Sequence, residues 1–425
     1  MREDWIECSL GEVCFTTSGG TPSRQNKDFY NGNIPWVKSG ELDKGIIYDS
    51  EEHISEEAIK KSSAKIFPKG TLLFALYGAT IGKMATLGVD AATNQAICGI
   101  YKSDALNSEY LYHNLFFQKN FLIQQGIGGA QPNISQTILK KLDIPLPPLV
   151  EQKAIVKKIE ELFSSLDSGI ADLKKAQDQL VIYRQAVLKK AFEGIKEFKP
   201  LKECGEWKGG GTPSRQIKEY WENGKIPWVS SRDVKTKEIH DTERHITEIA
   251  IPNSSTKWIE ENSLLFVMRS GILRRIFPIA IAKTKLCVNQ DIQTVSLDAN
   301  WNSEYVYWFL LGNESDIRHS CSKDGTTVES IDANSLKAYL VPFCSLKQQH
   351  QIVQEIESRL SVCDKVEKDL TDSLEKAQAL RQSILKKAFE GKLLSEDEIA
   401  TCKADKDYEP ASVLLERIKK EKKQK

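Results

Sequence analysis

The sequence has no long apolar run and no ordered pattern of cysteines. No stretch approaches the roughly 20 apolar residues that a membrane-spanning helix needs, and the first residues, Met1-Arg-Glu-Asp-Trp5, are charged rather than apolar. The nine cysteines are odd in number and none stands in a CxxC pair, which disfavours a disulfide framework and a zinc site. We therefore expect a cytoplasmic protein with reduced thiols and no membrane association.

The chain also lacks an excess of charge of one sign. It carries 59 Lys and Arg against 59 Asp and Glu, so no overall positive field attracts nucleic acid. Any basic surface that binds DNA must be local.

Sequence motifs of catalysis are missing. Gly78-Ala-Thr-Ile-Gly-Lys83 resembles a phosphate-binding loop, but it is one residue short, and Met84 stands where Ser or Thr would hold magnesium. His240 and His245 are five residues apart, the wrong step for two metal ligands on one helix face. We predict no catalytic residue and no metal site in this chain.

What the sequence does contain is a long internal repeat. A length of 425 residues predicts two or more domains, and the motifs of the first half return in the second. The matching segments are Gly19–Gln25 and Gly210–Gln216, Ile34–Val37 and Ile226–Val229, Asn94-Gln95 and Asn289-Gln290, Asn107–Tyr112 and Asn302–Tyr307, and Leu188–Gly194 and Leu385–Gly391. The period is far longer than that of a solenoid repeat, which indicates a duplicated domain followed by a helix.

The helix of each copy has a heptad pattern. Apolar or small residues recur at alternating steps of four and three, which is typical of a coiled coil. The first seam is Ile155, Ile159, Leu162, Leu166, Gly169, Leu173, Ala176, Leu180, Tyr183 and Val187, and the second is Ile352, Ile356, Arg359, Cys363, Val366, Leu370, Ser373, Ala377, Leu380 and Ile384. We predict that the two helices pair with each other, and about 45 residues give a rod of roughly 65 Å.

The predicted fold is therefore mixed α/β, with two globular domains separated by two long helices that form an antiparallel coiled coil. The expected bounds are 1–146 and 199–344 for the globular domains, 147–198 and 345–392 for the helices, and 393–425 for a C-terminal tail. Strands are expected at Thr71–Tyr77 and Ser263–Met268, because both are apolar runs that follow turn residues. The tail is expected to be loose before Glu409 and then helical, with Val413, Leu414 and Ile418 on one side. We interpret the basic end, Lys419–Lys425, as a solvated terminus rather than a phosphate-binding segment.

Taken together, the duplicated motifs resemble one family. Gly19-Gly-Thr-Pro-Ser23, Ile34-Pro-Trp-Val37, Gln131-Pro-Asn-Ile-Ser135 and Leu188-Lys-Lys-Ala-Phe-Glu-Gly194 are similar to segments of the specificity subunits of type I restriction-modification systems. The resemblance covers essentially the whole chain. It implies two target recognition domains, each reading half of a split DNA sequence, and a helical ruler that sets the gap.

The same resemblance implies which partners perform the chemistry. Two modification (methyltransferase) subunits would bring S-adenosylmethionine and methylate adenine, and motor-endonuclease (restriction) subunits would use ATP and magnesium. This chain would bind double-stranded DNA and no cofactor. A coiled-coil scaffold with two protein-binding domains stays open as the alternative, and an enzyme fused to its own reader is opposed by the missing methyltransferase motifs.

Residues that contact DNA can be divided by whether the copies share them. Two domains that read different half-sites are expected to share phosphate contacts and to differ where they touch base edges. The shared candidates for the DNA backbone are Thr21, Ser23, Arg24, Gln25, Thr212, Ser214, Arg215 and Gln216, for which a polar structural turn is an equal alternative. The base-reading candidates are Lys38, Ser39, Tyr77, Lys83, Gln131, Ser231, Arg232, Arg269, Ser270, Arg274 and Arg275.

Three further expectations concern these and neighbouring segments. The stretch Arg269–Arg275 is the leading base-reading candidate, because its charged residues follow a strand without a balancing carboxylate in the sequence. Pro35, Trp36, Pro227 and Trp228 are interpreted as structural, forming a turn and an aromatic core plug. Asn94-Gln95 and Asn289-Gln290 are interpreted as amides that hold the backbone rather than as base readers.

Overall fold

The protein is described from a computed structural model that covers residues 2, 4–126, 133–323 and 329–424. The chain divides into two compact units. Unit 1 comprises Met1–Asp172 and Ser373–Lys425, and unit 2 comprises Leu173–Asp372. This division cuts both long helices, so each unit contains one globular domain and one half of each helix. The predicted domain bounds follow the globular parts instead and stay a prediction.

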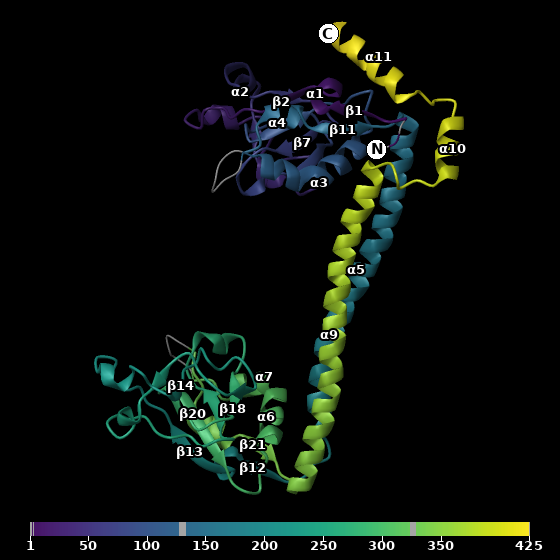
Figure 1. The fold of residues 1–425 in the computed structure, drawn as a ribbon. Coiled ribbons are helices and arrows are strands. Elements are labelled where there is room, and N and C mark those ends of the chain that lie inside the picture. Colours follow the sequence, from purple (N-terminus) through teal and green to yellow (C-terminus); the bar gives the residue numbers. More distant parts are fainter. Residues whose placement is uncertain (1, 3, 127–132, 324–328, 425) are drawn as a thin grey trace. The chain divides into compact units, whose positions relative to one another are not determined.

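The globular part of unit 1, here called domain 1, contains three small sheets (Figure 1). A five-stranded sheet has the order β2-β10-β7-β8-β4, a four-stranded sheet the order β5-β3-β9-β6, and β1 pairs with β11. The strands are β1 (Ile6–Ser9), β2 (Thr16–Ser18), β3 (Ile34–Val37), β4 (Ile46–Ile47), β5 (His53–Ile54), β6 (Ile66–Phe67), β7 (Leu72–Ala75), β8 (Met84–Leu87), β9 (Ala91–Thr93), β10 (Ile97–Ile100) and β11 (Asp143–Leu146). The helices are α1 (Leu10–Val13), α2 (Glu56–Lys61), α3 (Ser108–Gln125) and α4 (Gln136–Lys140).

The globular part of unit 2, here called domain 2, repeats this topology. Its sheets have the orders β13-β20-β17-β18-β15, β16-β14-β19 and β12-β21. Both five-stranded sheets end in a parallel pair, β4 with β8 and β15 with β18. The elements are β12 (Phe198–Pro200), β13 (Gly205–Gly209), β14 (Ile226–Val229), β15 (Glu238–Ile239), β16 (His245–Ile246), β17 (Leu264–Val267), β18 (Ile279–Ala282), β19 (Cys287–Val288), β20 (Ile292–Leu297), β21 (Leu340–Pro342), α6 (Ser303–Gly312), α7 (Glu314–Ser320) and α8 (Ala333–Ala338). The sequence repeat is therefore a repeat of the fold.

Local sequence explains the central elements of each copy. β7 and β17 are buried along their whole length, as apolar runs on a two-sided core strand require. The Asn107 side chain accepts a hydrogen bond from the Tyr110 amide and caps α3, and Asn302 caps α6 through Tyr305 in the same way. The strands predicted at these places are confirmed.

A buried glutamine joins each domain to a long helix. Gln152 lies at the start of α5 (Leu149–Ala191), where its Nε2 donates to the carbonyls of Ala105 and Pro147 and its Oε1 accepts from the Asn107 amide. Gln349, at the start of α9 (Leu346–Phe389), makes the equivalent bonds to Asn300, Cys344 and Asn302. Both glutamines are fully buried, so each helix starts from a fixed position on its own domain.

Within each unit, α5 and α9 lie side by side and run in opposite directions (Figure 1). In unit 1, Ile155 and Ile159 of α5 share a core with Ile384 and Leu385 of α9. In unit 2, Val187 and Leu188 share a core with Val353 and Ile356. Ion pairs cross the same seam, between Arg381 and Asp167 in unit 1, and from Arg184 to Asp364 (2.7 Å) and Glu367 (2.8 Å) in unit 2. The predicted antiparallel pairing is confirmed.

Several residues of the predicted seam are exposed. Val366 and Leu380 of α9 and Gly169 of α5 are exposed, and Leu360, beside the predicted seam, is buried. Arg359 of α9 and Tyr183 of α5 are exposed too, but they interact with each other and line one cavity between the two helices. Because an α-helix has 3.6 residues per turn, a strict 3.5-residue repeat drifts around the helix surface, so burial does not follow the predicted seam at every position.

The tail is folded rather than loose. Residues after α9 form α10 (Glu396–Ala404) and α11 (Ala411–Gln424). Leu414 and Ile418 are buried against domain 1, whereas Val413 is half exposed, contrary to the predicted apolar face. The basic end is also partly engaged, since Lys419 pairs with Glu12 (2.8 Å) and Lys422 Nζ donates to the carbonyls of Gly11 and Cys14. The hydrogen bonds from Lys422 satisfy backbone carbonyls at α1 and its C-cap. The Lys419 ammonium lowers the pKa of Glu12 to about 2.

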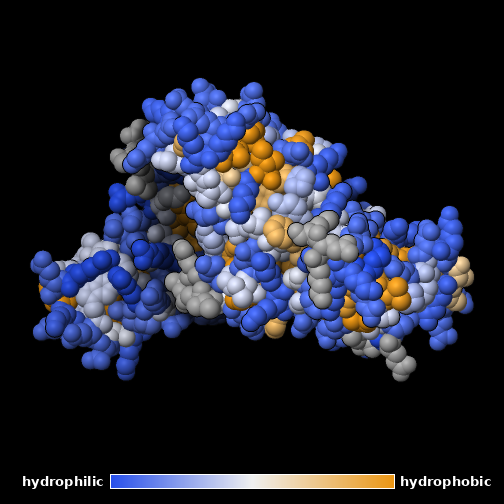
Figure 2. All heavy atoms as spheres, turned by 90° about the horizontal axis from the view of Figure 1, so that it is seen from above, coloured by the Kyte–Doolittle hydropathy of each residue, from blue (hydrophilic) through white to orange (hydrophobic). Residues whose placement is uncertain are grey.

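No helix in the described ranges is long and apolar enough to span a bilayer. The face drawn in Figure 2 is covered mainly by hydrophilic side chains, with apolar side chains gathered in separate patches.

Candidate nucleic-acid interface

A shared frame of glycine and tryptophan holds the Gly-Gly-Thr-Pro-Ser-Arg loop of each copy. The buried Trp36 of β3 donates its indole N–H to the Gly20 carbonyl (3.0 Å), and Trp228 of β14 donates to Gly211 (3.0 Å). A Cβ on Gly20 or Gly211 would lie within 2.5 Å of backbone atoms of a facing serine, so this close approach requires glycine. The tryptophans are core residues as predicted, but Pro35 and Pro227 lie in strands rather than in a turn.

The glutamine of each Asn-Gln pair contacts the same loop. Thr21 forms a hydrogen bond with Gln95, and Thr212 forms the equivalent bond with Gln290. The side chain of Asn289 makes a short-range contact instead, because its Oδ1 accepts a hydrogen bond from the Asp291 amide (3.1 Å). The described contacts of both threonines are therefore internal, whereas Ser23, Arg24 and Gln25 and their counterparts Ser214, Arg215 and Gln216 are exposed.

In domain 1 the loop arginine already has a carboxylate partner. Arg24 pairs with Glu52 (2.6 Å), and its guanidinium lies 4.2 Å from the ring centre of Tyr30. Lys38 pairs with Glu52 (3.0 Å) and with Glu51 (3.1 Å). The hydrogen bond from Arg24 lowers the pKa of Glu52, so this carboxylate stays charged. Domain 1 thus presents a cluster whose charges are balanced.

In domain 2 an arginine replaces one carboxylate of the corresponding cluster. The Trp36 amide donates to the carbonyl of Glu52 (2.8 Å), and the Trp228 amide donates to the carbonyl of Arg244 (2.9 Å). Glu52 and Arg244 therefore occupy the same position in the two copies, with opposite charge. Within the described ranges, neither Arg244 nor Arg215 makes an ion pair.

These cations line a cavity of about 290 Å³ beside the Trp228 frame. The cavity brings together the predicted residues Thr212, Arg215, Ser231 and Arg232 with Arg244, Gln290 and three carboxylates, Asp233, Glu243 and Asp291. A neighbouring cavity of about 550 Å³ shares Arg215 and Arg244 and adds Lys218 and Trp221. Guanidinium groups at such a surface suit phosphate oxygens and the acceptor edge of guanine. Sequence comparison of the copies at Glu51-Glu52-His53 and Glu243-Arg244-His245 would have shown Arg244, which the prediction missed.

The remaining base-reading candidates are more scattered. Lys83 pairs with Asp43 (3.0 Å), Ser39 begins a short 3₁₀ helix (Ser39–Glu41), and Tyr77 bridges to Asn133. Gln131 lies outside the described residues. No described contact joins Lys83 or Tyr77 to the Arg24 cluster.

The expectation that Arg269–Arg275 lacks a balancing carboxylate is wrong. Arg269 pairs with Asp291 (3.1 Å), which also lines the cavity beside Trp228, and Arg274 pairs with Glu329. Both carboxylates come from distant parts of the sequence, so the local pattern could not show them. Ser270 caps the 3₁₀ helix Gly271–Arg274, and Arg275 is exposed.

Comparison with protein families identifies relatives of this architecture. The model of the type I restriction modification DNA specificity domain matches residues 2–175 and 195–376. The specificity subunit of the Escherichia coli enzyme EcoR124I/EcoR124II is 35% identical over 254 residues, which are 59% of this chain and 62% of that protein. The specificity subunit of MjaIX from Methanocaldococcus jannaschii is 27% identical over 388 residues, covering 84% and 87% of the two chains.

Solved structures share the fold. The HsdS subunit from Thermoanaerobacter tengcongensis aligns with a TM-score of 0.62 at 19% identity, over 92% of this chain and 98% of that one. A chain from a structural study of complex assembly and conformational transition in a type I R-M system aligns with a TM-score of 0.73 at 19% identity, over 92% and 99%. The predicted mixed α/β fold with two long helices is confirmed.

Proposed function

The chain belongs to the DNA specificity subunits of type I restriction-modification systems, and we propose that its two domains each read one half of a bipartite, asymmetric DNA target. Recognition of DNA sequence is the function of this family, which disfavours the alternative of a scaffold with two protein-binding domains. The observation that supports the division into half-sites is the duplicated Trp-Gly frame, which carries Arg24 with Glu52 in one copy and Arg215 with Arg244 in the other. Two copies of the same Trp-Gly frame that carry different polar side chains are suited to two different half-sites.

In this proposal the loop residues and Arg244 bind the DNA backbone, and the residues that follow the tryptophan strand read bases. Arg215, with Ser214 and Gln216 beside it, would bind phosphate oxygens. Ser231 and Arg232, from the segment after β14, would face base edges, with Arg269 held toward the same cavity by Asp291. In domain 1 the equivalent roles fall to Arg24 with Ser23 and Gln25, and to Lys38 with Ser39. In domain 1 the cation that would contact a base edge, Lys38, is already paired with the carboxylates of Glu51 and Glu52.

We further propose that the chemistry resides in partner subunits. Two modification subunits would supply S-adenosylmethionine and methylate adenine in each half-site, and restriction subunits would supply ATP-driven and magnesium-dependent cleavage. The paired helices α5 and α9 would offer the docking surface for the modification subunits and set the gap between half-sites. The family relationship supports this assignment, since a relative of this fold was solved in a study of complex assembly.

Methylation mapping tests the proposed function. The chain is co-expressed with its cognate modification subunit, and N6-methyladenine is mapped across the host genome. We expect one motif with two specified halves, a fixed unspecified gap, and one methylated adenine in each half. A complex that binds all duplexes with equal affinity and leaves no bipartite mark would contradict the proposal. Omitting this chain is the control and should abolish the mark.

A further inference from the structure

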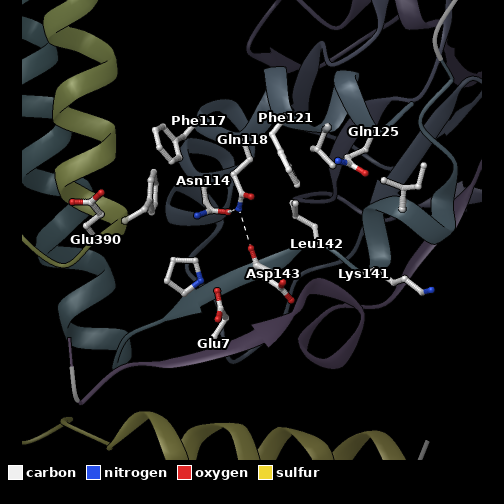
Figure 3. Close-up of a pocket in the computed structure, with 14 residues that line it drawn as sticks. Glu7, Asn114, Phe117, Gln118, Phe121, Gln125, Lys141, Leu142, Asp143 and Glu390 are labelled. Carbon is white, nitrogen blue, oxygen red and sulfur yellow. Dashed lines mark hydrogen bonds between the residues drawn. The ribbon is translucent and has the colours of Figure 1, made fainter. Parts of the chain in front are cut away.

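Domain 1 contains a groove that the DNA-reading residues do not use. It has a volume of about 560 Å³ and lies between α3, the β1–β11 ribbon and the end of α9, all within unit 1 (Figure 3). Phe117 and Phe121 of α3 form its apolar side, and Phe121 is 53% exposed. Glu7, Asp143 and Glu390 also line it, with Lys141 at a separate edge (Figure 3).

Two carboxylates of this groove are unpaired. Glu7 lies opposite Pro145 and Ser9 opposite Asp143 in the β1–β11 ribbon, so Glu7 and Asp143 are diagonal neighbours on one face. Neither makes an ion pair within the described part of the chain, and both are exposed. Glu390 is different, because Lys392 (2.8 Å) and Lys386 already pair with it. The open negative charge of the groove is therefore that of Glu7 and Asp143.

A buried donor at the floor of the groove lacks an acceptor. Asn114 is fully buried, and its Oδ1 accepts from Gln118 Nε2 (2.8 Å), which also donates to the Asp143 carbonyl (3.0 Å; Figure 3). Asn114 Nδ2 has no hydrogen-bond partner among the described residues. Unsatisfied buried donors are uncommon in native proteins, and this one lies beneath the surface of the groove, closed to solvent.

The second copy does not repeat these groups. By the register of the ribbons, Phe198 and Leu340 stand in place of Glu7 and Asp143. Phe309 stands in place of Asn114, and its ring packs against Phe192 at 5.2 Å. The polar groove is thus a property of domain 1 alone, whereas the fold around it is shared.

We propose that this groove receives a short segment of one modification subunit that presents an arginine or lysine beside an apolar side chain. The cation would pair with Glu7 and Asp143, and the apolar side chain would pack on Phe117 and Phe121. Carboxylates beside aromatic faces attract a cation, and phosphates of DNA are repelled by the same carboxylates. This inference rests on the proposed function, because it names a partner of that complex.

The asymmetry has a consequence for assembly. Since domain 2 carries Phe198, Leu340 and Phe309 at these positions, the second modification subunit cannot make the same contacts there. The two modification subunits are therefore held unequally, and loss of the groove weakens only one of them.

Photo-crosslinking of the assembled complex tests the partner. A benzoylphenylalanine replaces Phe121, and the same replacement at Phe15, which is 61% exposed and outside the groove, is the control. We expect a crosslink from position 121 to a modification-subunit peptide with Arg or Lys near the attachment site. Crosslinks only to DNA or to the restriction subunit, equal yields at both positions, or no crosslink would overturn the proposal.

Charge reversal tests the groove energetically. Glu7→Lys combined with Asp143→Lys should weaken the binding of one modification subunit about tenfold, seen by native mass spectrometry as a complex with one such subunit. Asp104→Lys, an exposed carboxylate outside the groove, is the matched control and should leave both subunits bound. If the reversal unfolds the chain, Glu7→Gln with Asp143→Asn should give a smaller loss in the same direction. Unchanged binding would reject the groove, while continued bipartite methylation would show that the proposed function still holds.

Discussion

One position of the duplicated frame reverses its charge between the copies. Glu52 and Arg244 have the same backbone role, since the carbonyl of each accepts from the amide of the core tryptophan. Glu52 neutralises Arg24 and Lys38, whereas Arg244 adds a cation beside Arg215. Because DNA affinity depends on salt through the number of phosphates neutralised, this residue is expected to make the two domains electrostatically unequal.

A charge exchange at this position gives a direct prediction. Arg244→Glu should pair with Arg215 as Glu52 pairs with Arg24, and should flatten the dependence of log affinity on log salt by about 1 to 2. Glu52→Gln should release Arg24 and steepen the dependence by about 1. Fluorescence anisotropy of the assembled complex on target DNA, between about 50 and 200 mM salt, measures both slopes.

The base preference provides the control for that experiment. If the two arginines bind phosphates, the methylated motif of the Arg244→Glu variant keeps its sequence in both halves. A changed motif with an unchanged salt slope would instead make Arg244 a base reader.

The residue scale also shows where sequence reasoning stops. The repeat predicted two loops of equal structure, because the identical segments Gly19–Gln25 and Gly210–Gln216 fold in the same way. It could not show that Asp291 and Glu329 balance Arg269 and Arg274, since these ion pairs join residues 22 and 55 positions apart. These ion pairs depend on the tertiary fold, which short sequence patterns do not show.

At the scale of elements, the long helices and the helical end of the tail were predictable, whereas α10 was not. Heptad spacing identified α5 and α9, and the exposed Val366 and Leu380 show that it did not fix the exact seam. The tail lacks such a period, yet α11 is ordered by burial of Leu414 and Ile418 against domain 1. Tertiary packing, which a short terminal helix needs for stability, decides its structure.

The packing of α11 predicts the effect of a single truncation. Leu414→Ala removes a fully buried side chain and should destabilise the docked helix by about 2 kcal/mol, near the lower end for buried leucine. Val413→Ala, half exposed on the same helix, is the control and should change stability by less than about 0.5 kcal/mol. Hydrogen exchange of peptides covering α1 and α11 measures the opening, because release of α11 also removes Lys422 from the α1 carbonyls. Equal exchange in both variants would show that α11 does not depend on this side chain.

At the scale of the whole molecule, we propose that the length of the paired helices sets the gap between the two half-sites. Each helix starts from a buried glutamine on its own domain, Gln152 or Gln349, so a change in helix length is transmitted to the domain rather than absorbed in a flexible joint. Ion pairs on opposite halves of the pair, Arg381 with Asp167 and Arg184 with Asp364, fix the register of α5 against α9. The length of the helices and their register would together determine the gap between the half-sites.

A paired insertion tests this role. One heptad is inserted between Leu166 and Leu180 in α5 and another between Leu370 and Arg381 in α9, which keeps the antiparallel seam in phase. Seven residues at about 1.5 Å per residue add roughly 10 Å, or about three base pairs at about 3.4 Å each. Methylation mapping should then show the same two half-sites with a gap about three base pairs longer. The heptad placed in α5 alone is the control and should reduce methylation, because it breaks the register. An active paired variant with the original gap would show that the helices do not set the spacing, since both domains would then reach the same half-sites through a longer rod.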